Sequence, residues 1–302
     1  MTISAKIIAD SINDRDTRIT TVELEYPRFI HSELMTHRVF SRNSASSRAI
    51  PIKTMLDTIT ANPATPIHWG KNQAGMQAKE ELEQPAKVRA QSLWNEAMQS
   101  AVSLSEKMHE TNVHKQIANR ITEPFQHMKV VVTSTEWNNW DWLRNHPDAQ
   151  PEIAALAKCI AHAREESTPS LLEHGEWHMP YVNTRRHEHG YLEYLDEEGN
   201  VISIKQAIMI SASCCAQASY RKSDTSLEKA EMIYNRLIES EPCHASPVEH
   251  QALCFDNIYT RANVLTWMDG ITHMSRDGRF WSGNFRDWIQ YRQLIPNNAK
   301  RG

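Results

Sequence analysis

The sequence predicts an α/β (α+β) protein in which helices pack against a sheet. Residues 6–25 contain two short segments in which apolar and polar side chains alternate, a pattern typical of half-buried strands. Residues 128–133 form a compact β-branched run of the kind that makes a buried strand. Residues 77–114 have the composition of a helix, and residues 226–240 have the spacing of one.

In the first third of the chain, turn and helix signals follow the strand segments closely. Asn13 and Asp14 predict a turn between the two N-terminal strands, and Pro27 closes the second strand. A short helix is expected at residues 29–37, followed by a loop at residues 62–73. The region 77–114 is rich in Ala, Glu, Gln and Met, which predicts a long helical region with Pro85 as an early interruption.

In the rest of the chain, helices alternate with one hairpin. Residues 137–143 and 152–163 predict two helices, and residues 191–204 predict a hairpin that turns at Gly199-Asn200. The helix expected at 226–240 is amphipathic, with one face formed by Leu227, Ala230, Ile233, Tyr234 and Leu237. Near the C-terminus, helical spacing predicts a core or subunit contact for Trp281, Phe285 and Trp288.

The overall composition is that of an ordinary globular chain. It has 302 residues, 40% of them hydrophobic and 23% charged, so it can bury a sizeable core. The net charge of −4 gives no reason to expect a nucleic-acid polymer or an anionic membrane as a partner. A small phosphorylated ligand, held by a local cluster of arginines, is compatible with this balance.

The cysteine count and the hydropathy of the chain indicate which kinds of site and which cellular location to expect. The five cysteines are odd in number and include no CxxC pair, which argues against a disulfide framework or a cysteine-rich zinc site. We find no signal peptide and no apolar run of membrane-spanning length, so we expect a cytoplasmic protein, in the host cytoplasm if the source is viral.

The most informative segment is residues 35–48. It contains three arginines, one histidine and five side chains that are serine or asparagine. Such a run is too polar for a buried strand, and its side chains compete with the backbone hydrogen bonds of a helix. Forked cations beside small hydroxyl groups are suited to binding a phosphate. A solvated basic loop is the simpler alternative.

Four blocks of the sequence resemble the flavin-dependent thymidylate synthases. The first has the family's arginine signature at the expected spacing, in His37, Arg38, Ser41, Asn43, Ser46 and Arg48. The second is Asn119-Arg120-Ile121, ahead of Pro124. The third resembles the family's catalytic helix and the turn after it, with Asn139, Leu143, Arg144, Ala149, Gln150, Glu152 and Ile153. The fourth, residues 244–250, matches a His-x-Ser/Thr-Pro-x-Glu-His segment.

The order of these blocks differs from that of the family, in which the fourth block precedes the arginine signature. Here it follows about two hundred residues later, which predicts a circularly permuted, phage-type variant. The resemblance implies a single domain over residues 1–302, with helices on a mostly antiparallel or mixed sheet. It leaves a helical insertion near 77–114 and a hairpin insertion near 168–204 without a counterpart, and it implies a homotetramer.

The resemblance also implies a role for particular residues. Arg144 would be catalytic, lying against the pyrimidine and favouring its ionised form. The residues implied to bind the nucleotide are Ser44, Ser46, Ser47, Arg48, Arg120 and Arg144. Those implied to contact the flavin are His37, Arg38, Asn139, His244, Ser246 and Glu249. FAD would be the cofactor, with NADPH and methylenetetrahydrofolate as co-substrates, so no nucleophilic cysteine is required.

Some positions depart from the family pattern. Thr36 stands where the family has its first arginine, and Ser44 where it usually has glutamate. Thr133 and Thr135 replace an asparagine and an arginine that would help to bind flavin, and Asp148 replaces a histidine. The nucleotide residues are therefore better preserved than the flavin residues.

Three functions are compatible with this pattern. The first is flavin-dependent one-carbon transfer to C5 of a pyrimidine deoxynucleotide monophosphate, converting dUMP to dTMP. The second is a dUMP or dCMP hydroxymethylase, in which water traps the transferred carbon because a hydride donor is missing. The third is a catalytically silent nucleotide-binding protein, which the retention of Arg144 with Arg48 and Arg120 argues against.

Histidines and acids also suggest a metal site. His174, Glu176 and His178 alternate along the chain, His187-Glu188-His189 follows, and His244 precedes Glu249-His250. None of these sets has the HExxH or HxxEH spacing of zinc proteases, and no closed ligand set is visible. We therefore expect no metal.

Overall fold

The computed structural model describes residues 3–75, 77–218, 224–255 and 267–300. Its main sheet has five strands in the order β3-β4-β2-β1-β5. Their bounds are β1 (Ser4–Ile12), β2 (Arg18–Pro27), β3 (Ser41–Ser44), β4 (His127–Ser134) and β5 (Ser170–Leu171). All neighbours pair antiparallel except β1 and β5, which are parallel. The predicted fold class, helices on a mostly antiparallel or mixed sheet, is confirmed.

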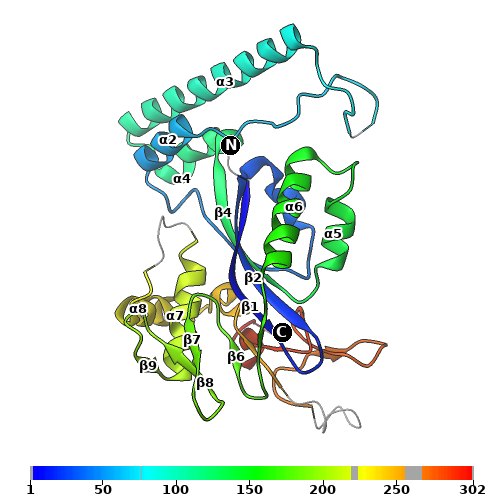
Figure 1. The fold of residues 1–302 in the computed structure, drawn as a ribbon. Coiled ribbons are helices and arrows are strands. Elements are labelled where there is room, and N and C mark those ends of the chain that lie inside the picture. The colour runs from blue at the N-terminus through cyan, green and yellow to red at the C-terminus, as the bar shows by residue number, and fades with distance from the viewer. Residues whose placement is uncertain (1–2, 76, 219–223, 256–266, 301–302) are drawn as a thin grey trace.

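One face of this sheet is covered by α5 (Asn138–Arg144) and α6 (Pro151–Glu166), which pack beside it in Figure 1. Alternate side chains of β2 and β4 point into this interface because successive residues of a strand face opposite sides. Val22, Leu24 and Val132 are fully buried there against Ile153 and Trp140. The hairpin, the buried strand and both helices predicted here are confirmed.

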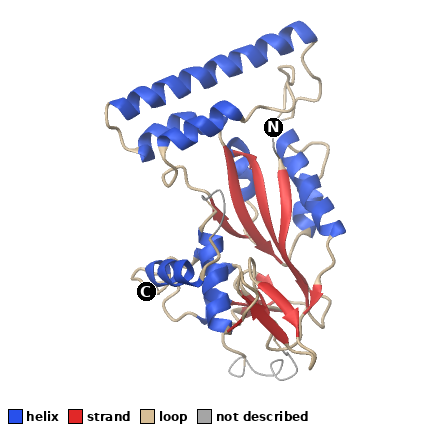
Figure 2. Cartoon of the chain, turned by 60° about the vertical axis from the view of Figure 1, so that its left-hand side comes forward, coloured by secondary structure: helices blue, strands red, loops and turns tan. Residues whose placement is uncertain are grey.

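A helical layer extends from one end of the sheet. It comprises η1 (Arg28–Ile30), α1 (His31–Met35), α2 (Ile52–Ala61), α3 (Gln84–Glu110), α4 (Lys115–Ala118) and η2 (Asn119–Phe125). Figure 2 shows α3 lying apart from the sheet as one long helix. Its buried residues are Met98, Ala101 and Ser105, so most of its surface is exposed.

The prediction of a helical region from residue 77 was wrong at its start. Residues 77–83 are not helical, and α3 begins at Gln84 with Pro85 in its first turn. A proline at this position starts a helix rather than interrupts it, because its missing N–H would have no intrahelical partner there.

The remaining described chain forms three small sheets, two α-helices and two short 3-10 helices. The sheets contain β6 (Trp177–His178) with β10 (Ala252–Leu253) and β14 (Ile289–Gln290); β7 (Asn183–Arg186) with β8 (Leu192–Leu195) and β9 (Val201–Ile202); and β11 (His273–Met274) with β12 (Phe280–Ser282) and β13 (Phe285–Arg286). The helical segments are α7 (Ile204–Ala216), α8 (Leu227–Leu237), η3 (Ser246–Glu249) and η5 (Tyr291–Leu294). The hairpin predicted to turn at Gly199 is β8–β9, and Gly199 has a φ of 87°.

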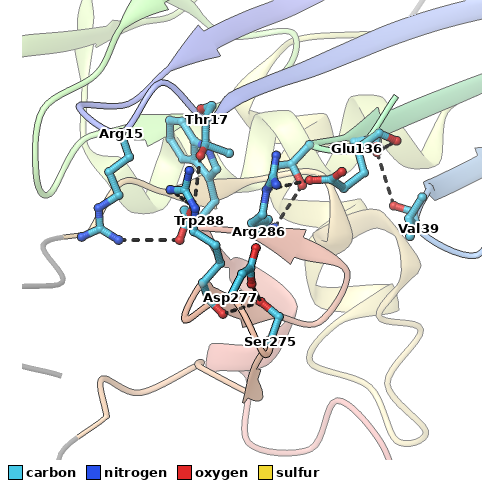
Figure 3. Close-up of polar contacts among 12 residues, drawn as sticks. Arg15, Thr17, Val39, Glu136, Ser275, Asp277, Arg286 and Trp288 are labelled. Atoms are coloured by element: carbon cyan, nitrogen blue, oxygen red, sulfur yellow. Dashed lines mark hydrogen bonds and ion pairs between the residues drawn. The ribbon is translucent and has the colours of Figure 1, made fainter. Parts of the chain in front are cut away.

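A cluster of hydrogen bonds and ion pairs, which we call the Asp287 cluster, joins the β1–β2 turn to the C-terminal segment (Figure 3). The fully buried Asp287 carboxylate accepts hydrogen bonds from Thr17 at 3.1 Å and Arg279 at 2.8 Å, and Arg15 lies 3.6 Å away. Trp288 Nε1 donates to the Thr17 carbonyl at 3.0 Å. The helix expected from the aromatic spacing in this segment is therefore replaced by short strands, although Phe285 and Trp288 are buried as predicted for a core contact.

No helix in the described ranges has both the length and the apolar character needed to span a membrane.

Candidate active site

Arg144 is the last residue of α5, and its guanidinium is held by three side chains of one short segment. Nε donates to His37 Nε2 at 3.0 Å, Nη1 to Glu33 Oε2 at 2.9 Å, and Nη2 to Thr36 Oγ1 at 3.2 Å. All three partners belong to α1 or to the two residues that follow it. The structure therefore brings two sequence-predicted residues together, Arg144 and His37, and adds Glu33, which no sequence motif indicated.

His37 owes its role to its surroundings. Its ring is buried, stacks on Phe40 at a centroid distance of 5.6 Å and meets Trp140 edge-on at 4.8 Å. Burial, together with the smaller effect of the charges of Arg144 and Arg42, lowers the pKa of His37 to about 4. The imidazole is therefore neutral near pH 7, so its Nε2 can accept the hydrogen bond from Arg144.

An open cavity of about 310 Å³ adjoins Arg144 on the side of α5. It is lined by Trp142, Leu143, Arg144, His146, Asp148 and Ala149. The Trp142 side chain is 73% exposed, which is unusual for a residue of its size. A planar ring could stack on the exposed indole at this cavity.

Two of the predicted phosphate-binding residues, Ser47 and Arg120, meet at Glu123 in η2. Glu123 Oε1 accepts from Ser47 Oγ at 3.2 Å and lies 3.6 Å from Arg120 and 3.2 Å from Arg28. Asn119 Nδ2 donates to the Ser47 carbonyl at 2.7 Å, which fixes the loop. Residues 46–48 and 119–120 are distant in sequence, and the fold places them side by side.

The arginines among these predicted phosphate-binding residues are accessible to solvent. Arg48 is exposed, and the Arg120 side chain is 60% exposed. Ser46 Oγ accepts from the Arg48 backbone N–H at 3.3 Å, and Ser44 is exposed at the end of β3. Two accessible guanidinium groups beside a hydroxyl-rich loop can bind a phosphate through charge-assisted hydrogen bonds. Among the described residues, no hydrogen bond or ion pair joins these predicted phosphate-binding residues to Arg144.

The segment 244–250 lies beside residues 41–44 of the arginine signature, although it comes much later in the chain. Gln290 Nε2 donates to Ser41 Oγ at 3.1 Å and to the Glu249 carbonyl at 3.2 Å, linking β3 to η3. The Glu249 carboxylate pairs with Arg292. Burial raises the pKa of Glu249, against the effect of Arg292.

Arg42 is a second residue that the sequence motifs did not indicate. Its Nη1 donates to the carbonyl oxygens of Met35 and His37 at 3.0 Å each. These bonds fix the turn that carries Thr36 and His37, so Arg42 supports the arrangement around Arg144. Burial lowers the pKa of Arg42, against the effect of nearby Glu249.

The residues implied for flavin binding only partly fit that cofactor. Arg38, Asn139, His244 and Ser246 are exposed, whereas His37 is engaged by Arg144 and Glu249 by Arg292. Thr135 Oγ1 accepts from the Arg286 N–H at 3.0 Å, and Thr133 Oγ1 bonds to Thr21 at 2.7 Å and His250 at 2.8 Å. These threonines face protein partners where the resemblance expects flavin contacts. The set is incomplete, and we assign no reaction step to a flavin.

The candidate metal residues do not converge. In the described ranges, no group of three or more histidine, cysteine, aspartate or glutamate side chains is arranged to hold a metal ion. Glu176 instead pairs with Arg186, and His178 bonds to the hydroxyl groups of Ser11 and Thr21.

Comparison with known proteins decides the family. The family described as "Thymidylate synthase complementing protein" matches residues 17–170, which include both Arg48 and Arg144. The chain belongs to this family. Membership confirms the resemblance and indicates a thymidylate synthase-like, methyltransferase-type enzyme acting on a pyrimidine nucleotide. The segment 244–250 lies outside the match, so the circular permutation stays a prediction.

Two solved structures of the UMP/dUMP methylase PolB from Streptomyces cacaoi are similar to this member of the family. The complex with 5-Br UMP is 15% identical, covers 55% of this chain and 89% of its own, and has a TM-score of 0.47. The complex with 5-Br dUMP is 14% identical, covers 55% and 91%, and has a TM-score of 0.43. No curated protein matches the chain.

Proposed function

We propose that this enzyme transfers a one-carbon unit from methylenetetrahydrofolate to C5 of a pyrimidine deoxynucleotide monophosphate. The reaction that the resemblance implies is conversion of dUMP to dTMP. The observation that carries the proposal is the anchoring of Arg144 by His37 and Glu33 beside an open cavity. Arg144 would contact the base, while Ser44, Ser46, Ser47, Arg48 and Arg120 would bind the phosphate.

The residues of this chain act on the base and on its orientation. A fixed guanidinium beside the pyrimidine stabilises electron density on the ring and so makes C5 more nucleophilic. A bond then forms between C5 and the methylene carbon as the first of the two carbon–nitrogen bonds to the folate breaks. Loss of the C5 proton and cleavage of the second carbon–nitrogen bond release tetrahydrofolate and leave an electrophilic exocyclic carbon. A hydride, which NADPH would supply as the reductant, would give a methyl group there, and addition of water with loss of a proton would give a hydroxymethyl group.

Hydroxymethylation is the second candidate because the flavin residues are incomplete. Thr36 accepts from Arg144, and Thr133 and Thr135 bond within the protein. With FAD and NADPH implied only by the resemblance, water is the alternative acceptor of the carbon. A homotetramer is likewise proposed from the resemblance, and the exposed length of α3 provides surface for subunit contacts.

Mass spectrometry of the nucleotide tests the reaction directly. The protein is incubated with dUMP or dCMP, methylenetetrahydrofolate, FAD and NADPH, and we expect the nucleotide to gain one carbon at C5. A methyl product supports the thymidylate synthase type, and a hydroxymethyl product supports the second candidate. If both nucleotides are recovered unchanged while they bind, the silent nucleotide-binding alternative is favoured.

Substitution of the proposed phosphate-binding arginines provides a separate prediction. Arg48→Ala and Arg120→Ala are each expected to weaken nucleotide binding about tenfold, since each removes a charge-assisted hydrogen bond to phosphate. Affinity for the corresponding nucleoside should change little. Isothermal titration calorimetry measures both, with the exposed Arg89→Ala on α3 as a matched control. Equal affinity of the variants and the parent protein for the nucleotide would rule out this phosphate site.

A further inference from the structure

The carboxylate of Glu33 lies beside the guanidinium that the proposed function assigns to the base. Its Oε2 pairs with Arg144 Nη1 at 2.9 Å, and the side chains are 33% and 20% exposed. Within the described part of the chain, no side chain or backbone group is bonded to Glu33 Oε1. The site therefore offers a fixed cation and a free carboxylate oxygen next to each other.

We propose that Glu33 selects the base, and that the substrate is a cytosine deoxynucleotide monophosphate rather than a uracil one. This inference rests on the proposed function, in which Arg144 contacts the pyrimidine. It departs from the dUMP that the family resemblance implies. Glu33 is then a specificity-determining residue that accepts a hydrogen bond from the 4-amino group of cytosine.

The free hydrogen-bonding groups of Arg144 fit cytosine. A guanidinium has five N–H donors, and here three of them are bonded to His37, Glu33 and Thr36. One N–H remains on each Nη, so two donors are left for a ligand. Cytosine presents two neighbouring acceptors, O2 and N3, beside a donor at N4. The two Nη donors match the acceptors, and Glu33 Oε1 matches the amino group.

Uracil fits the same groups poorly. Its N3 carries a hydrogen, so a donor would face the guanidinium donors. Its O4 is an acceptor, so it would face the Glu33 carboxylate without a proton between them. A site built to accept a particular N–H discriminates against an analogue that lacks it, because the acceptor then faces another acceptor instead of a donor.

The charge of the pair supports the same choice. A lone arginine favours an N3-ionised uracil, because it stabilises the negative ring. In this structure the carboxylate of Glu33 compensates the charge of Arg144 at contact distance. A neutral pair with one donor side and one acceptor side is better suited to a neutral base whose edge carries both kinds of group.

Calorimetry with three nucleotides tests the inference on the unmodified protein. The probes are dCMP, dUMP and the pyrimidin-2-one deoxynucleotide monophosphate, which retains O2 and N3 but lacks the 4-amino group. We expect dCMP to bind at least about tenfold more tightly than either of the others. This comparison needs no substitution and so does not depend on the folding of a variant.

The variant Glu33→Gln provides the second arm. Its amide can keep an oxygen toward Arg144 and place an N–H₂ donor where the carboxylate oxygen stood, so the preference should shift about tenfold or more toward dUMP. Asp141→Asn is the matched control, because Asp141 lies on α5, pairs with Arg164 of α6 at 2.8 Å, and should leave the preference unchanged when replaced.

The outcomes separate the two proposals. If the parent protein binds and converts dUMP better than dCMP, or if Glu33→Gln leaves the ratio unchanged, the base assignment is overturned and the proposed function stands. If the parent protein binds none of the three nucleotides, the proposed function fails and the base assignment fails with it. A dCMP preference that is lost in Glu33→Gln and kept in Asp141→Asn supports the inference.

Discussion

Replacement of Arg144 by alanine is expected to lower kcat by about 10²–10³ while nucleotide affinity changes far less. The guanidinium is oriented by His37, Glu33 and Thr36, so its charge acts on a bound base without reorganisation. Affinity for the whole nucleotide should depend more on Arg48 and Arg120. Single-turnover kinetics and calorimetry on the same variant measure the two quantities separately.

Two further variants show whether the effect comes from Arg144 itself. Arg144→Lys keeps the charge but not the fork that contacts three partners, so it should recover only a small part of the lost rate. Arg186→Ala removes another arginine paired with a glutamate, on β7, and should leave kcat unchanged. Normal turnover in Arg144→Ala would remove this residue from the mechanism.

Acid should destabilise the fold strongly through two buried histidines. His178 and His250 have almost no exposed surface and belong to one hydrogen-bonded chain. Ser11 Oγ lies 2.9 Å from His178 Nδ1, and Thr21 Oγ1 lies 2.9 Å from His178 Nε2. Thr21 then connects through Thr133 to His250 Nδ1, at 2.7 and 2.8 Å. This series of hydrogen bonds joins the main sheet to β6 and to the segment after η3.

The direction of the pH effect follows from the pKa values. Burial lowers the pKa of both His178 and His250 to about 3, from 6.5 in the unfolded chain. For His178 the nearby charge of Asp10 opposes this shift. The stabilising contribution of the neutral rings is therefore complete above pH 6.5 and is lost as the pH falls from there toward 3. Linkage gives about 2 kcal/mol for each histidine between pH 7 and pH 5.

Urea unfolding followed by tryptophan fluorescence at pH 7, 6 and 5 measures this loss. His250→Gln cannot take up a proton and should show a smaller decrease in unfolding free energy over the same range, even if it is less stable at pH 7. His162→Gln, on the exposed side of α6, is the matched control and should retain the decrease of the parent protein. Parallel pH profiles for all three proteins would contradict the assignment to buried histidine.

The sequence predicted those elements whose stability is local or whose pattern is strong. The β1–β2 hairpin, β4, α5 and α6 follow from alternation, β-branching and helical spacing, and the structure confirms them. The helix α2 lies in a stretch for which no element was predicted, since its threonine and isoleucine content favours strands as much as helices. Its stability comes from packing against α3, which a local pattern cannot show.

The candidate site was predictable only where a motif carried it. Ser47 and Arg120, from two separate blocks of the resemblance, both contact Glu123, and their role in binding phosphate stays a prediction. Glu33 was missed because a single glutamate in a short helix has no distinguishing sequence context. Its importance comes from Arg144, which is 111 positions away. Thr133 and Thr135 were recognised as departures, but their partners His250 and Arg286 lie more than a hundred residues further along.

The Asp287 cluster affects the order in which contacts form as the chain folds. The β1–β2 turn is synthesised long before its partner, because Thr17 and Asn13 both bond to Asp287, which lies 270 and 274 positions further along the chain. Contacts of such long sequence separation form late and slow the folding of a domain. The hairpin can therefore pair early on the ribosome, but its turn stays without these bonds until the segment that contains Asp287 has been translated.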